Sequence, residues 1–346
     1  MRGSLTERYH WSTDAIGGHV KYASRQAQSL ARSTPARVSE WRARRQRGLA
    51  RRPLVWVYRN SIQGSGTFMR GEQLSAMVRK HARDRLVVRY TDETGVTDLR
   101  NSVIWATRSF LADATPEELE RLRAANNIIC ADYLDFPPRP LLHPHIDVYI
   151  AASVSQLNWL RKTFPRKTVH HVTHHADPAT ARVRVPVDFC NIGYFGEIPN
   201  AKYRAELQGL VGFVQTNNAN YRRRDWVYSL RHYNMHYAVR TWFYPTRDPG
   251  PGSFKPFTKG FNAAHCRANI IVPGTESDAE HYLGGDYPYM LADDSLKTVR
   301  EMVEFAKDSF RGPEWFGGLE VMAELRRATA PARIAQEVED LVRSCD

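Results

Sequence analysis

The chain has 346 residues, of which 42% are hydrophobic and 25% charged, a composition that excludes a disordered or fibrous protein and a length that favours two domains. No apolar run approaches the ~20 residues that span a bilayer, and the polar start lacks the apolar stretch of a secretory signal peptide. The four cysteines form no CxxC pair, so neither a zinc site nor a disulfide framework is expected. We therefore expect a cytoplasmic enzyme or binding protein.

The net charge of +12 is concentrated at the start of the chain. Residues 1–52 hold 12 basic against three acidic residues, so the remaining chain carries only +3. A solvated extension explains this charge, and contact with the anionic inner face of a membrane is the second interpretation. Nucleic-acid binding ranks third because no RNA-binding motif accompanies the charge.

From Pro53 onward, apolar runs typical of strands alternate with segments typical of helices. In the first half, strands are predicted at 54–58, 85–90, 103–106, 127–131, 148–152 and 169–173, and helices at 68–81, 115–125 and 155–164. In the second half, strands are predicted at 189–196, 235–239 and 269–273, and helices at 203–213, 226–233, 257–266, 295–310 and 319–343. Such alternation predicts parallel sheets with helices on both faces.

The fold class is therefore α/β, with two Rossmann-like domains that face each other across a cleft and a basic N-terminal extension. The predicted boundaries are 1–52 for the extension, 53–183 for the first domain and 184–346 for the second, with a last helix able to pack back on the first domain. Ligands of open α/β sheets bind outside the carboxyl ends of the strands. We expect the functional site there.

One segment of the second domain is suited to a diphosphate. Lys255 and Lys259 stand four residues apart, and Pro256 is compatible with a first helical turn whose N–H groups are unpaired. Thr258 adds a hydroxyl, and Asn262 lies one turn further along, within reach of a ribose or sugar hydroxyl. A helix start with two solvated lysines explains the same residues equally well.

The stretch FKPFTKGFNAAHCRANIIVPGTES, residues 254–277, resembles the donor-binding motif of GT-B-fold glycosyltransferases, and within them the retaining family-four type. The resemblance covers residues 53–346 in layout. It implies a nucleotide-diphosphate sugar as the donor. Two glutamates usually bracket this helix in that family; Lys255 stands near the first position and Asn262 or Ala263 near the second. Glu276 is the nearest acidic residue, and two roles are open for it: it binds the ribose of the donor, or it is an ordinary loop carboxylate.

A second stretch, residues 192–202, resembles the glycine loop that opens the donor domain of that family. Its predicted donor-binding residues are Gly193, Tyr194, Gly196 and Lys202. Lys202 matches the family's lysine, whereas Tyr194 or Phe195 occupies the position of its arginine. Further along the chain, Arg240 and Tyr244 follow the next predicted strand and are also placed near the donor.

A third stretch, residues 60–71, resembles the first loop of the acceptor domain. Gly64, Ser65, Gly66 and Thr67 are the predicted substrate-binding residues, since glycine allows close backbone approach. A simple strand-to-helix turn explains these residues as well.

Three residues are candidates for proton transfer: His174, His175 and Asp92, each following a predicted strand. A structural role remains an alternative for each of them. The adjacent histidine pairs at 170–171 and 174–175 do not predict a metal site, because neighbouring side chains on a strand point to opposite faces.

These features predict a glycosyltransferase that moves a sugar from a nucleotide-diphosphate sugar to a glycan, a lipid-linked acceptor or another hydroxyl. Neither a metal nor a cofactor is expected, because lysines and a helix N-terminus stabilise the leaving diphosphate. The main alternative is a non-catalytic protein that binds nucleic acid or an anionic membrane through residues 1–52. An epimerase or kinase acting on phosphorylated substrates is a further alternative, but the sequence has neither a GxxxxGK[ST] loop nor a complete GxGxxG.

Overall fold

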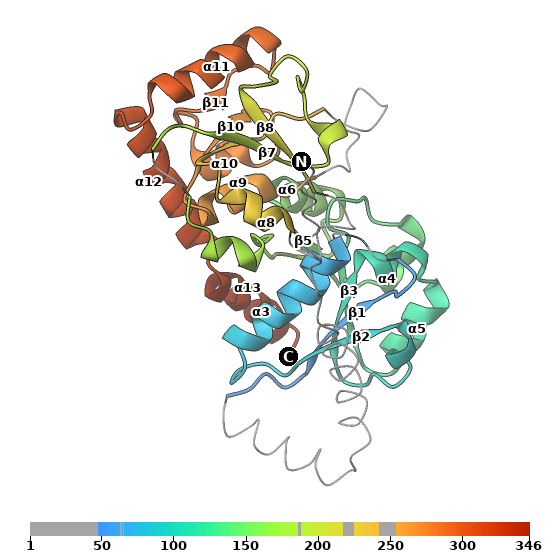
Figure 1. The fold of residues 1–346 in the computed structure, drawn as a ribbon. Helices are drawn as coiled ribbons and strands as arrows, with labels where there is room; N and C mark the ends of the chain where they lie inside the picture. The colour runs from blue at the N-terminus through green and yellow to red at the C-terminus, as the bar shows by residue number, and fades with distance from the viewer. Residues whose placement is uncertain (1–47, 63, 65, 186–187, 217–224, 242–253) are drawn as a thin grey trace, which may run out of the picture. The chain divides into compact units, whose positions relative to one another are not determined.

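A computed structural model describes residues 48–62, 64, 66–185, 188–216, 225–241 and 254–346. Ala50–Asp346 form one compact unit. The basic extension lies almost wholly outside the described residues. Within the compact unit, two parallel sheets are each covered by helices (Figure 1). We call each sheet with its helices a lobe, the first lobe being the one that contains β1.

The first sheet has six parallel strands in the order β2-β1-β3-β4-β5-β6. The strands are β1 (Leu54–Tyr58), β2 (Val88–Asp92), β3 (Val103–Thr107), β4 (Ile128–Asp132), β5 (Val148–Ala151) and β6 (Thr168–His171). The helices that follow them are η1 (Thr67–Gln73), α3 (Leu74–His81), η2 (Glu93–Gly95), α4 (Arg108–Asp113), α5 (Pro116–Ala124), η3 (Pro140–His145), α6 (Val154–Thr163) and η4 (Pro178–Arg182). The order reverses between β1 and β3, which is where open α/β sheets bind ligands.

Alternation along the central strand divides the core of the first lobe into two layers. In β1, Val55 and Val57 pack in the layer that contains α4, α5 and α6. Leu54 and Trp56 point to the opposite face, in the layer that contains α3. All four side chains are fully buried, so this strand is covered on both faces, as a central parallel strand requires.

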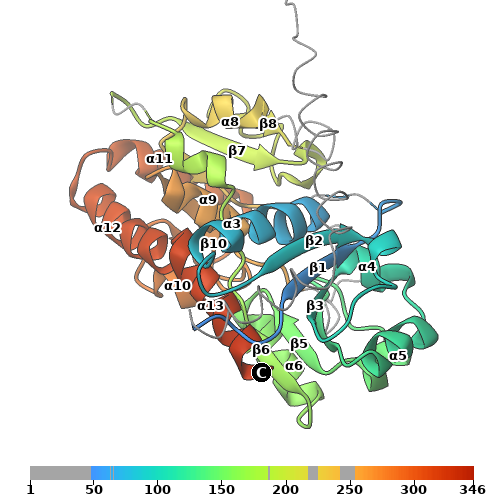
Figure 2. The same cartoon turned by 90° about the horizontal axis from the view of Figure 1, so that it is seen from below.

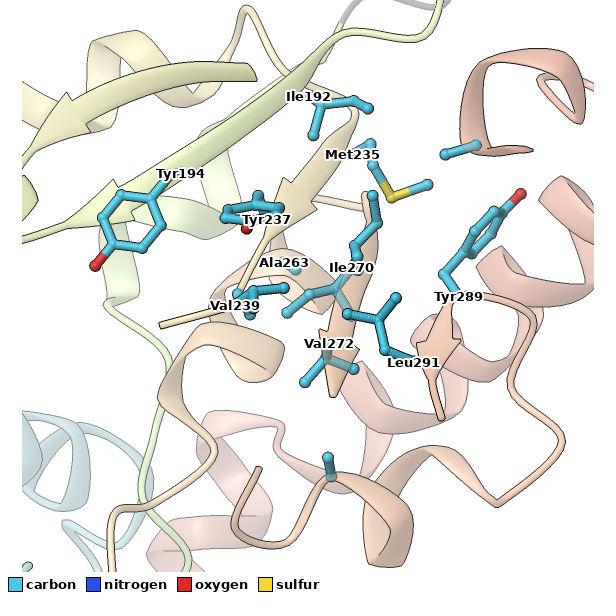
Figure 3. Packing of buried hydrophobic residues seen from close by; sticks show 14 of the residues in the cluster. Ile192, Tyr194, Met235, Tyr237, Val239, Ala263, Ile270, Val272, Tyr289 and Leu291 are labelled. Atoms are coloured by element: carbon cyan, nitrogen blue, oxygen red, sulfur yellow. The ribbon is translucent and has the colours of Figure 1, made fainter. Parts of the chain in front are cut away.

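The second sheet has five parallel strands in the order β11-β10-β9-β7-β8. They are β7 (Ile192–Gly196), β8 (Val211–Gln215), β9 (Met235–Tyr237), β10 (Asn269–Pro273) and β11 (Met290–Leu291). The helices are η5 (Ile198–Asn200), α8 (Asp225–Leu230), α9 (Thr258–His265), α10 (Ala279–Leu283), α11 (Leu296–Asp308) and α12 (Pro313–Ala328). Figure 3 shows side chains of β7, β9, β10 and β11 packing into one buried cluster, among them Ile192, Tyr237 and Ile270.

The last helix, α13 (Pro331–Ser344), belongs to the core of the first lobe although it follows the second sheet in sequence. It packs against α3 (Figures 1 and 2). Ile334, Val338 and Leu341 are fully buried there beside Leu54 and Trp56. The chain therefore crosses back from the second lobe to complete the first.

The predicted α/β fold with two parallel sheets is confirmed, whereas two local predictions are wrong. Residues 203–213 are not a helix: turns lead into strand β8, and Gly209 takes a left-handed backbone with φ of 82°. Pro256 does not lie in the first turn of α9, which begins at Thr258. Phe257 has a non-helical ψ of 44° and its ring is 1% exposed, so burial of this ring holds the preceding residues outside the helix.

Candidate functional site

Loops at the carboxyl ends of the two sheets contact each other directly. The Asp278 carboxylate, after β10, accepts hydrogen bonds from the backbone N–H groups of Val154 (2.7 Å) and Ser155 (2.9 Å), at the start of α6 after β5. Asp278 has a left-handed backbone with φ of 62°. The carboxylate of one lobe thus caps a helix of the other, an arrangement favoured by the helix dipole.

The second lobe gathers cationic side chains near the end of β7, which we call the cation cluster: Arg240, Lys255 and Lys259. Lys259 extends from α9, donates to the backbone carbonyl of Phe195, and holds its ammonium 4.0 Å from the centre of the Tyr194 ring. No carboxylate among the described residues lies within ion-pair distance of this ammonium. A cation in this position is held by a carbonyl and an aromatic face, without charge neutralisation.

Glu276 is an acid whose charge acts on both lysines of the cluster. It forms a two-pronged ion pair with Arg240, with a Nε–Oε2 distance of 3.0 Å. Both side chains are largely buried, at 14% and 6% exposed. Glu276 was predicted either to bind ribose or to be a loop carboxylate; in the structure it orients Arg240.

The pKa values of both lysines are lowered. Burial is the larger cause at Lys259, and the positive charge of Arg240 adds to it, bringing the pKa to about 7. Burial also lowers the pKa of Lys255, again with Arg240 as the next cause, while Asp135 and Arg108 of the first lobe act on the same ammonium. An anionic ligand at this site would favour the charged form of both amines.

Gly196, the last residue of β7, leaves open the space beside Lys259. A Cβ atom at this position would lie 2.9 Å from the Lys259 ammonium nitrogen and 2.7 Å from the Tyr194 hydroxyl. Any larger residue would displace these groups. The structure thus brings together six of the predicted donor-binding residues: Tyr194, Gly196, Arg240, Lys255, Lys259 and Glu276.

A hollow of about 430 Å³ lies in the first lobe, at the carboxyl ends of β1, β3 and β4. We call it the first-lobe hollow. Its wall includes the predicted substrate-binding residues Gly64, Gly66 and Thr67. Other lining residues, which the sequence analysis did not single out, are Ile62, Arg108, Ser109, Leu111, Ala112, Tyr133, Phe136, Pro137 and Arg139. Its volume is in the range of small-molecule sites.

The predicted residue His175 lies in a buried hydrogen-bond chain between the lobes, and His174 joins it by donating from Nδ1 to the His175 backbone carbonyl (2.9 Å). His175 Nε2–H donates to the Gln73 amide oxygen (3.1 Å), and the Gln73 amide donates to Asp177 (2.8 Å). The backbone N–H of Asp177 donates to the Asn262 side chain in α9 (2.9 Å). Burial lowers the pKa of His174 to about 3 and that of His175 well below its usual range, so both rings are neutral at physiological pH.

Other predicted site residues are engaged elsewhere. Lys202 forms an ion pair with Asp294 (2.7 Å), and Gly193 makes room for the Tyr233 ring, which a Cβ atom would approach to 2.6 Å. Asp92 accepts hydrogen bonds from Asn60 (2.7 Å) and Thr94.

The remaining three predicted site residues are Thr258, Ser65 and Tyr244. Thr258 begins α9, and its hydroxyl lies 3.4 Å from the Pro256 carbonyl. Ser65 and Tyr244 lie outside the described residues.

The sequence analysis missed Arg70, whose charged side chain is buried in the first lobe. It is 2% exposed, pairs with Asp132 at 2.8 Å and donates to the carbonyls of Val172 (3.0 Å) and Thr173 (3.3 Å). Trp105 donates to the same carboxylate (3.1 Å). The partners of the Arg70 side chain are 62 to 103 residues away in sequence, so no local sequence pattern would have identified them.

No helix among the described residues combines the length and apolar character needed to cross a membrane. Within the same residues, no three or more His, Cys, Asp or Glu side chains gather in a way that would hold a metal ion.

Comparison with known proteins supports the fold. No protein-family model matches the sequence, and a search of curated proteins finds no significant match. HepE from Anabaena, solved in complex with UDP, matches with a TM-score of 0.58 and 8% identity over 84% of this chain and 100% of that chain. A glycosyltransferase from Rickettsia africae matches with a TM-score of 0.54 and 5% identity over 85% and 98% of the two chains. The chain has the GT-B glycosyltransferase fold that the sequence resemblance implied.

Proposed function

We propose that the protein transfers a sugar from a nucleotide-diphosphate sugar, bound at the cation cluster, to a hydroxyl acceptor bound in the first-lobe hollow. The observation that carries the proposal is the pair of lysines, Lys255 and Lys259, held at the carboxyl end of the second sheet with lowered pKa values. Neither ammonium has a carboxylate within ion-pair distance among the described residues. Burying cations in this way is costly unless an anion completes the site.

The ligand that fits is a diphosphate. Gly196 leaves the approach to Lys259 open, and Arg240 is held in place by Glu276. During transfer, negative charge grows on the diphosphate oxygen that leaves the sugar. Fixed cations stabilise that charge without having to reorganise, which is how electrostatic catalysis lowers a barrier. These residues supply the positive charge, so we expect activity to persist in EDTA.

The predicted bases receive different roles in this proposal. A histidine with a pKa of about 3, such as His174, is a weak proton acceptor near neutral pH, where the best general bases titrate. We assign His174 and His175 to positioning, because their hydrogen-bond chain reaches Asn262 on the donor-side helix α9. Asp92 remains a candidate base, although Asn60 and Thr94 already hold its carboxylate.

Calorimetry with UDP and with the other nucleoside diphosphates tests the donor site and identifies the nucleobase that the site prefers. Lys255→Ala and Lys259→Ala should each weaken binding by about 10- to 100-fold, the value of one charge-assisted hydrogen bond. Lys297→Ala is the matched control, because Lys297 is an exposed lysine of α11 in the same lobe. If no nucleoside diphosphate binds, or if both site variants bind as Lys297→Ala does, the proposal is wrong.

A further inference from the structure

We propose that the first-lobe hollow selects an acceptor whose sugar-like ring carries a carboxylate or a phosphate group. The inference rests on the proposed function, because it names the chemistry of the acceptor in that reaction. Three features of the wall support it: an ordered guanidinium without a carboxylate partner, a buried hydroxyl without an acceptor, and exposed apolar surface beside them.

The charge of the wall is positive. Arg108 and Arg139 line the hollow, and none of the described residues that line it is acidic. Arg108 is partly neutralised by Asp135, at 2.9 Å. No carboxylate of the described residues lies within ion-pair distance of the Arg139 guanidinium. The hollow therefore retains an unbalanced positive charge.

Arg139 is also fixed in position before any ligand arrives. Its Nη1 donates to three backbone carbonyls around the end of α4, those of Leu111 (3.0 Å), Ala112 (3.0 Å) and Ala114 (2.9 Å). No side chain among the described residues accepts a hydrogen bond from the other N–H groups of this guanidinium. A guanidinium ordered in this way binds a planar or tetrahedral oxyanion with little further loss of side-chain freedom.

Tyr133 supplies a second polar group. The residue is 4% exposed and lines the hollow; its hydroxyl lies near the backbone N–H of Arg139, and no group of the described residues accepts a hydrogen bond from it. Burial raises its pKa to about 12, so the group remains a donor at neutral pH. A buried hydroxyl without an acceptor is unfavourable, and an acceptor oxygen of a ligand would satisfy it.

The apolar part of the wall suits one face of a ring. Phe136 and Ile62 are 37% and 38% exposed. The guanidinium of Arg108 lies 3.5 Å from the centre of the Phe136 ring and fixes its orientation. Aromatic surface beside polar groups binds molecules with one apolar and one polar side. The combination favours a hydroxylated ring with an anionic substituent over a wholly apolar or a neutral ligand.

The experiment measures binding of three probes to the full chain without nucleotide, by ligand-observed NMR titration: glucose, glucuronate and glucose 6-phosphate. We expect at least one of the two anionic sugars to bind about tenfold or more tightly than glucose, as one charge-assisted bond allows. The better of the two identifies the anion as carboxylate or phosphate. Weakening of this preference at high salt is expected for the same reason.

Two variants locate the binding. Arg139→Gln should reduce the affinity for the anionic sugar about tenfold, and Tyr133→Phe, which removes only a hydroxyl, about three- to tenfold. Arg121→Gln is the control, because Arg121 lines a separate hollow of about 440 Å³ in the same lobe. If Arg139→Gln unfolds the protein, as thermal melting would reveal, Tyr133→Phe alone decides the matter.

Equal affinities for the three sugars, absence of binding, or equal losses in Tyr133→Phe and Arg121→Gln would overturn the inference. These outcomes are independent of the donor site. If UDP binding depends on Lys259 but the anionic sugar has no preference for the hollow, only the acceptor assignment fails. If no nucleoside diphosphate binds, the proposed function fails even where the sugars behave as expected.

Discussion

Proton uptake on donor binding is the sharpest consequence of the lowered Lys259 pKa. With a pKa of about 7, Lys259 is about one-quarter protonated at pH 7.5. A bound diphosphate favours the charged ammonium, so binding should draw a proton from solution. If the bound form is fully protonated, the uptake is about 0.75 proton per UDP.

The same linkage sets how affinity changes with pH. Only the protonated form of Lys259 binds well, and its fraction falls as the pH rises above about 7. The dissociation constant for UDP should therefore increase about eightfold between pH 7.5 and pH 8.5. UDP itself contributes little, because its terminal phosphate, with a pKa near 6, is already ionised in this range.

Calorimetry in buffers of different ionisation enthalpy measures the uptake directly. Lys259→Met should bind UDP more weakly and without the uptake. Lys259→Arg, which keeps its charge throughout, should retain binding but lose the pH dependence. An uptake near zero in the unmodified protein, or the same uptake in Lys259→Met, would refute the reasoning even if UDP binds.

Three further predictions concern stability. Asp278→Ala should cost about 1 kcal/mol because it removes the acceptor of the Val154 and Ser155 amides at the start of α6, while Ser153 still caps Gln156; hydrogen exchange should speed at those two amides, and unchanged exchange would contradict the capping role. Arg70→Met should cost about 3–5 kcal/mol in urea unfolding, because it leaves Asp132 buried without its cation; a cost below 1 kcal/mol would count against the pair. Burial lowers the pKa of both His174 and His236 to about 3. The neutral state of these two histidines therefore stabilises the fold fully above pH 6.5, and this contribution to the free energy of unfolding is lost progressively toward pH 3. The loss should be about 1 kcal/mol for each histidine between pH 6.5 and 5.5; a free energy of unfolding that does not change over this interval would contradict the prediction.

The sequence predicted the sheets well because their strands are buried on both faces. The prediction at 269–273 coincides with β10, whose residues are all buried. Thr115, the first residue of the helix predicted at 115–125, is the N-cap of α5 and accepts from the backbone N–H of Glu118. The prediction at 203–213 failed because Tyr203, Leu207 and Val211 have helical spacing and are packed in the core or against it.

The candidate site was less predictable because its partners are distant in sequence. The motif at 254–277 indicated Lys259, but not that Phe195, 64 residues earlier, would receive its ammonium. Lys202 matched a family position, yet Asp294 pairs with it from 92 residues away. Tyr133 and Arg139 carry no motif, because a hollow is formed by three strand ends that only the fold brings together.

The position of α13 has a consequence for how the chain folds during synthesis. The last strand of the first lobe is synthesised about 160 residues before the helix that covers one layer of its core, an interval of roughly 10 to 30 seconds at ordinary elongation rates. During that time Leu54 and Trp56 lack the cover that Ile334 and Val338 later provide. The first lobe therefore completes its core only after the second lobe has been synthesised, and a chain that ends before Pro331 leaves this layer uncovered.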